Sequence, residues 1–275
     1  MKLNETHIFQ KWETFKDFCS KRVKGITTGI KSLDKGLLGL RGIVCILGEP
    51  ASCKSTLALQ ISLYHAKRHG PVLFIDKENG INRLRIRSIC NLGKVSEIDV
   101  ITNSFDGIDR IVGGISKLPF YVCTENVSIL EIDSLVLEAI NLHKKPVLLV
   151  IDSLQALPID FNDQRGSIDS WLIGLDGLKL KYENWLTILL TSEKRRGSYD
   201  KAMKDSGKES GRIEYKAELM LDLIYDKNAN CIKVECTKNR DGPCGELTRL
   251  TLELADENNP MSFCYNLKDL EEIEI

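Results

Sequence analysis

The chain has 275 residues, of which 43% are hydrophobic and 28% are charged, and its formal net charge is −1. This length and hydrophobic content are typical of one large globular domain with room for a short appendage. The near-neutral charge excludes a global basic field that would attract nucleic acid, so any such binding has to come from a local patch.

The nine cysteines include no C-x-x-C pair. This spacing disfavours a zinc site and indicates free thiols in a reducing compartment. The N-terminus lacks the apolar core of a signal peptide, and no apolar run of the length needed to cross a membrane occurs in the sequence. We therefore expect a cytoplasmic protein with no membrane association.

The segment 5–22 places apolar residues at steps of three and four, which predicts an amphipathic helix. The apolar stripe consists of Ile8, Phe9, Trp12, Phe15, Phe18 and Cys19. Two interpretations stay open: the stripe packs against its own domain, or it docks on a neighbouring subunit. We treat 1–22 as a linker-type helix and 23–275 as the main domain.

An apolar strand from Ile43 to Leu47 leads into a loop of the form G-x-x-x-x-G-K-[ST], and a helical pattern follows the loop. The loop consists of Gly48, Glu49, Pro50, Ala51, Ser52, Cys53, Lys54, Ser55 and Thr56. This pattern predicts a phosphate-binding loop, because its backbone N–H groups and the helix N-terminus surround an anion. We expect Lys54 to reach the β- and γ-phosphates of ATP, and the Ser55 hydroxyl to hold Mg²⁺.

Cys53 stands where this loop usually has its last glycine. The added Cβ is expected to crowd the β-phosphate or to impose an unfavourable backbone dihedral, at a cost of about 1 kcal/mol or more. Because cysteine is small, we expect weakened or altered nucleotide handling before outright loss.

Strands and helices alternate along the next part of the chain. Strands are expected at 72–75, 120–122, 146–151 and 185–191, and helices at 55–69, 81–92, 105–118, 129–143 and 168–182. The alternation predicts a parallel sheet with right-handed connections. Strands at 218–225, 231–237 and 247–254 follow as hairpins, and we expect them to extend the sheet with antiparallel members.

Acidic residues follow two of the expected strands. Asp76 and Glu78 come directly after 72–75, and Asp152 ends the run 146–151. Ligands gather at the carboxyl ends of such sheets, so we expect these carboxylates over the same edge as Lys54. On geometry we favour Glu78 over Asp76 as the base that activates the attacking water, and we expect Asp152 to hold Mg²⁺ together with Ser55.

Basic residues mark two loops and a turn. The loop 158–166 contains Arg165, and the segment 193–212 carries seven bases, four acids and scarcely an apolar side chain. From this segment we expect Lys194, Arg195, Arg196 and Lys201 to grip single-stranded DNA, while a merely solvated loop is the alternative. The turn 238–245 presents Lys238 and Arg240, as an arginine finger does toward a γ-phosphate bound to the next subunit.

These pieces together resemble the RecA-like ATPases, and specifically the C-terminal motor domain of the DnaB replicative helicase family. The resembling segments are 25–29 with Leu33 and Asp34, 48–50, Glu78 with Leu84 and Arg87, 152–155, Arg195, 209–214 and 238–245. The resemblance implies a RecA-like three-layer αβα core with a mostly parallel twisted sheet. It further implies Mg²⁺-dependent ATP hydrolysis, DNA-path loops that include Arg165, a hexamer as the expected homo-oligomer, and replication or recombination proteins as partners.

The chain departs from that family pattern at three points. Cys53 replaces the glycine of the loop, and Ser192 stands where the family has a glutamine that senses the γ-phosphate. The primase-interacting N-terminal domain is expected to be absent. Two alternatives to a helicase-like motor therefore stay open: a RecA- or RadA-like recombination or annealing mediator, and a KaiC-like nucleotide-dependent assembly or signalling module.

Overall fold

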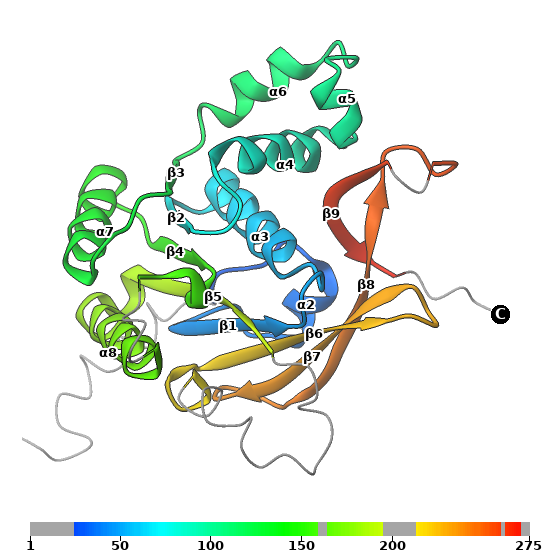
Figure 1. Ribbon diagram of the computed structural model, residues 1–275. Helices are drawn as coiled ribbons and strands as arrows, with labels where there is room; N and C mark the ends of the chain where they lie inside the picture. The colour runs from blue at the N-terminus through cyan, green and yellow to red at the C-terminus, as the bar shows by residue number, and fades with distance from the viewer. Residues whose placement is uncertain (1–24, 159–163, 195–212, 260–261, 271–275) are drawn as a thin grey trace, which may run out of the picture.

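A computed structural model describes residues 25–158, 164–194, 213–259 and 262–270, and the helix expected within 1–22 lies outside these ranges. Figure 1 shows the arrangement of the elements. In chain order they are α2 (Lys31–Gly36), β1 (Ile43–Gly48), α3 (Lys54–Arg68), β2 (Val72–Asp76), α4 (Ile81–Gly93), α5 (Glu97–Ile101), α6 (Ile108–Ile115), β3 (Phe120–Cys123), α7 (Ile129–His143), β4 (Val147–Asp152), η2 (Leu154–Ala156), α8 (Gln164–Tyr182), η3 (Glu183–Trp185), β5 (Leu186–Glu193), β6 (Leu219–Asp226), β7 (Cys231–Asn239), β8 (Gly245–Leu254) and β9 (Phe263–Asp269).

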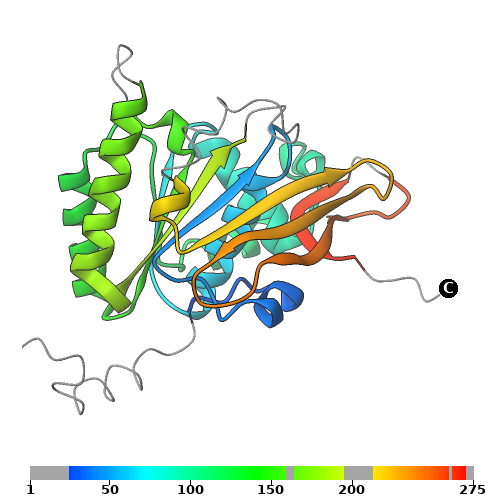
Figure 2. The ribbon, with the colours of Figure 1, turned by 90° about the horizontal axis from the view of Figure 1, so that it is seen from below.

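The strands form one nine-stranded sheet in the order β3-β2-β4-β5-β1-β6-β7-β8-β9. The pairs from β3 to β6 are parallel, and the pairs from β6 to β9 are antiparallel. Helices α7 and α8 cover one face, while α3 and α4 cover the other (Figures 1 and 2). The predicted three-layer αβα core with a C-terminal antiparallel extension is therefore confirmed.

The apolar strand runs are continuous because both faces of the sheet are covered. In β1, Val44 and Ile46 belong to the core on the α3 side, whereas Ile43, Cys45 and Leu47 belong to the core on the α7 and α8 side. Strand β4 divides its side chains between the two cores in the same alternating way. This is the pattern of a doubly covered parallel sheet, in which successive side chains point to opposite faces.

Strand β9 returns toward α3 and is fixed there by one side chain. The Gln60 amide donates to the Leu267 carbonyl at 2.9 Å and accepts from the Leu267 amide at 2.7 Å. Because Gln60 and Leu267 are both buried, these two hydrogen bonds satisfy polar groups that would otherwise lie unpaired in the core.

Most expected elements form near their predicted bounds, with three differences. Strand β9 and helix α5 were not predicted, and the helix expected at 105–118 is confined to Ile108–Ile115. The apolar stripe of α6 contains no buried residue, and Val112 is 43% exposed. Among the described helices, none is long and apolar enough to cross a membrane.

Candidate active site

The loop between β1 and α3 encloses the side chain of Lys54. Its Nζ donates to the carbonyl oxygens of Gly48 at 3.0 Å and Glu49 at 2.8 Å. Burial lowers the pKa of Lys54, although the nearby Glu193 and Glu78 carboxylates oppose that shift. The loop therefore presents a partly buried cation beside the N-terminus of α3, which is an arrangement suited to a phosphate group.

The start of the loop requires a glycine. A Cβ on Gly48 would lie 2.3 Å from the Ser52 Oγ and 2.8 Å from the Leu223 carbonyl oxygen. The Ser52 hydroxyl is itself buried and has no hydrogen-bond partner among the described residues. A polar group without a partner in a phosphate-binding loop is consistent with a ligand that accepts its hydrogen bond.

Cys53 adopts the left-handed conformation expected at a glycine position, with φ 65° and ψ 22°. For a residue with a Cβ this conformation costs about 1 kcal/mol, so the predicted unfavourable dihedral is confirmed. The side chain packs partly buried against the α3-side core. Burial also raises the pKa of the Cys53 thiol.

A hydroxyl and a carboxylate meet directly beside the loop. The Ser55 Oγ donates to the Asp152 Oδ1 at 3.0 Å, and the Thr191 Oγ1 donates to the same oxygen at 2.5 Å. Asp152 is only 1% exposed, and burial raises its pKa although both hydrogen bonds oppose that effect. A buried carboxylate next to a hydroxyl suits a hard cation such as Mg²⁺, which takes few protein ligands and completes its shell with phosphates and water.

The residues after β2 join this centre through hydrogen bonds. Asp76 lies beside Asp152 in the sheet register, and its Oδ1 accepts from the Asn79 backbone N–H at 3.0 Å. The Asn79 Nδ2 donates to the Asp152 Oδ2 at 3.2 Å, while the Ser153 hydroxyl donates to the Glu78 Oε1. Asp76 thus shapes the turn, and the Glu78 carboxylate lies over the same edge as Lys54.

Lys238 and Arg240 lie at the opposite edge of the sheet. Lys238 pairs with Met220 near the start of β6, and β6 runs parallel to β1, with Leu223 beside Gly48. Three residues of strand separate Met220 from Leu223, which corresponds to about 10 Å along the sheet. The described structure therefore does not bring these two cations into the phosphate-binding loop of their own chain.

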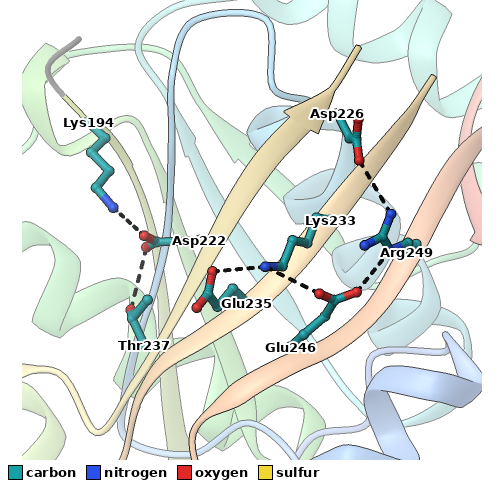
Figure 3. A network of polar contacts seen from close by, with 8 residues as sticks. All are labelled: Lys194, Asp222, Asp226, Lys233, Glu235, Thr237, Glu246 and Arg249. Atoms are coloured by element: carbon teal, nitrogen blue, oxygen red, sulfur yellow. Dashed lines mark hydrogen bonds and ion pairs between the residues drawn. The ribbon is translucent and has the colours of Figure 1, made fainter. Parts of the chain in front are cut away.

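The base of the basic segment is attached to the sheet beside the loop. The Lys194 amide donates to the Gly48 carbonyl oxygen at 3.1 Å, and its Nζ forms an ion pair with Asp222 of β6 (Figure 3). Arg195, Arg196 and Lys201 lie outside the described residues, and Arg165 is described only as part of α8.

The sequence did not single out Thr191, Asn79 or Gln155 as site residues. Thr191 and Asn79 contact Asp152, and the Gln155 Nε2 donates to the Ser192 Oγ at 2.6 Å. Position gave the signal in each case, since Thr191 lies near the end of a buried strand and Asn79 and Gln155 follow the acidic strand ends.

Comparison with known proteins adds a family and a fold. The family model for the DnaB-like helicase C-terminal domain matches residues 25–255. A solved structure of an isolated ATPase domain has a TM-score of 0.80 at 20% identity, over 97% of this chain and 99% of that chain. Another, "The Structure Of A DnaB-Like Replicative Helicase And Its Interactions With Primase", has a TM-score of 0.80 at 21% identity, over 98% of this chain and 70% of that chain. No curated protein sequence matches the chain.

Proposed function

This chain belongs to the DnaB-like helicase C-terminal domain family and is an ATP-hydrolysing motor domain of the DnaB type, and we propose that it binds ATP over residues 48–56. The backbone amides of the loop surround the phosphates, and Lys54 reaches the β- and γ-phosphates in place of its present carbonyl partners. The left-handed Cys53 retains the backbone path of the loop and adds a Cβ beside the ligand.

The single observation that carries this proposal is the 3.0 Å hydrogen bond from the Ser55 hydroxyl to Asp152. These two groups would hold Mg²⁺, with Ser55 contacting it directly and Asp152 through water. When bound there, Mg²⁺ supplies charge neutralisation for the β- and γ-phosphate oxygens. Thr191 and Asn79 keep the Asp152 carboxylate in a fixed orientation by donating to its two oxygens.

Glu78 is the proposed general base. Its Oε1 accepts from the Ser153 hydroxyl, so the side chain is held over the edge where Lys54 lies. From there the carboxylate would orient the attacking water and accept its proton as the γ-phosphate leaves.

Lys238 and Arg240 would complete the site of an adjoining copy. Both lie about 10 Å along the sheet from their own loop, which supports action between subunits rather than within one chain. A ring or filament of identical chains, with a hexamer as the expected ring, would place these cations beside a neighbour's γ-phosphate.

The proposed substrate path is single-stranded DNA, contacted by Arg165, Lys194, Arg195, Arg196 and Lys201. Lys194 supports this role by its position, because its backbone is bonded to Gly48 of the nucleotide loop. Replication proteins are proposed partners, since a structural relative is described in its interactions with primase.

The test is the ATPase rate of the assembled protein with and without single-stranded DNA, together with strand displacement. The wild type is expected to be stimulated by DNA and to displace a strand. Lys54→Ala should lose Mg·ATP binding. Arg240→Ala should keep binding but lose about 10³-fold in turnover, the lower end of what such cations contribute. Arg249→Ala is the matched control, since Arg249 is an exposed arginine of β8 paired with Glu246 and Asp226.

Three results would contradict parts of this proposal. Full turnover by assembled Arg240→Ala would exclude cations acting between subunits. An unchanged salt slope of DNA affinity after neutralising Lys194, Arg195 and Arg196 would exclude the basic segment as a DNA contact. DNA coating without strand displacement would select the recombination mediator, and ATP binding without DNA affinity would select the assembly module.

A further inference from the structure

The helical turn at 213–216 holds both cations that are proposed to act on a neighbour (Figure 2, the short yellow turn beside α8). The Lys238 Nζ donates to the Glu214 carbonyl oxygen, and an Arg240 Nη2 donates to the Tyr215 carbonyl oxygen at 2.8 Å. The last carbonyls of a helical turn have no partner within it and carry partial negative charge, so they suit cationic donors.

Helix α8 fixes this turn from beneath. The Lys216 Nζ donates to the Asp176 Oδ2 at 2.6 Å, and Asp176 also pairs with Lys179 at 2.7 Å. The Asp176 side chain is 18% exposed. Burial alone would raise the pKa of Asp176, but the hydrogen bonds from Lys179 and Lys216 outweigh it and lower the pKa. Asp176 therefore stays ionised at neutral pH and keeps Lys216 bound.

Glu218 joins the same cluster to the strand of the phosphate-binding loop. It accepts from Lys179 at 2.8 Å and from the Ile43 amide at 2.6 Å, and its carbonyl oxygen accepts from the Arg240 amide at 3.0 Å. The cluster Asp176, Lys179, Lys216 and Glu218 thus connects α8, the start of β1 and the base of the turn that carries Arg240.

We propose that Asp176 is a positioning residue for Lys238 and Arg240, acting through Lys216 and the turn at 213–216. This inference rests on the proposed function, in which the two cations act on ATP held by an adjoining copy. A shift of the turn by about 1 Å would displace both cations from the γ-phosphate, and a misplacement of that size costs about 10²-fold in rate. The nucleotide loop of the same chain would be unaffected, because it lies at the other edge of the sheet.

The experiment compares Asp176→Asn with Asp133→Asn in the assembled protein. Asp176→Asn should lower kcat by about 10- to 100-fold and leave the KM and the Mg·ATP affinity within about twofold. Asp133→Asn is the matched control, because it breaks the pair with Lys181 of α8, which does not reach the turn. Thermal unfolding of each variant shows whether the domain remains folded.

Lys216→Met provides a second route to the same test. It removes the bond to the turn and retains the Asp176–Lys179 pair. If both residues act through one contact, the double variant loses no more turnover than either single variant, and Lys216→Arg retains activity. Additive losses, or an unchanged kcat in both single variants, would overturn the proposal.

Mixed assemblies separate a positional defect from a defect in the chain's own site. Lys54→Ala subunits have an intact turn and no working loop, so mixing them with Asp176→Asn subunits should raise turnover above that of Asp176→Asn alone. No recovery would overturn the proposal. If Arg240→Ala retains full turnover, the proposed function itself fails; if Arg240→Ala loses turnover while Asp176→Asn does not, the positioning role alone fails.

Discussion

Replacement of Lys194 by methionine tests how the buried carboxylate of Asp222 is balanced next to the nucleotide loop. In Figure 3 the lysine points at Asp222, whose remaining partner in view is the Thr237 hydroxyl at 3.5 Å. The Asp222 side chain is 4% exposed, and that of Lys194 is 27% exposed. Methionine keeps the length of the side chain and removes its charge, so it leaves a buried carboxylate without its cation.

The magnitude follows from this difference in exposure. Removing one partner of a fully buried ion pair costs about 3–5 kcal/mol. Because Lys194 is partly exposed and water reaches its end of the pair, we expect about 2–3 kcal/mol. For a domain of this size such a loss lowers Tm by roughly 5–10 °C.

Two further variants give the comparison its direction. Asp222→Asn should cost less, about 1 kcal/mol, because Lys194 can turn toward water whereas Asp222 cannot. Lys181→Met, which breaks the more exposed pair with Asp133, should cost less than about 1 kcal/mol. The assay is thermal and urea unfolding without nucleotide. Equal losses for Lys194→Met and Lys181→Met, or a larger loss for Asp222→Asn, would refute the argument from burial.

Three more predictions concern the loop, the metal pair and a buried histidine. Cys53→Val should destabilise by about 1–2 kcal/mol, because a β-branched side chain fits the left-handed backbone poorly, whereas Cys53→Gly should stay within about 1 kcal/mol of wild type; equal melting temperatures for the two variants would contradict the strain. Burial raises the pKa of Asp152, so ionisation costs stability as pH rises through that pKa, and Asp152→Asn without Mg²⁺ should gain Tm at pH 7 and less near pH 4. Burial, followed by His69, lowers the pKa of His65 to about 4, so stability falls as pH drops from 6.5 toward 4; His65→Leu should remove about 3 kcal/mol of that fall, read from unfolding at both pH values.

Sequence reasoning found the parts of the site that local pattern determines. A strand, a loop and a helix in succession are enough to place residues 48–56, and acids at strand ends are enough to place Glu78 and Asp152 at the same sheet edge. Thr191 and Asn79 could not be assigned in this way, because their contacts with Asp152 depend on which strands are neighbours.

The position of Lys238 and Arg240 likewise required the three-dimensional arrangement. Hairpin spacing predicted the turn that carries them, but periodicity does not say that β6 pairs in parallel with β1 and so puts that turn at the far edge. Strand β9 was missed although Phe263, Tyr265 and Leu267 alternate, because the strand is short and follows a polar stretch.

Calorimetric titration with Mg·ATP tests the central claim most directly, namely that the loop before Lys54 holds a triphosphate despite Cys53. The account predicts saturable uptake of one Mg·ATP per chain by the wild type, its loss in Lys54→Ala, and loss of the Mg²⁺ dependence in Asp152→Asn. No detectable heat of binding by the folded wild type at millimolar Mg·ATP would contradict it.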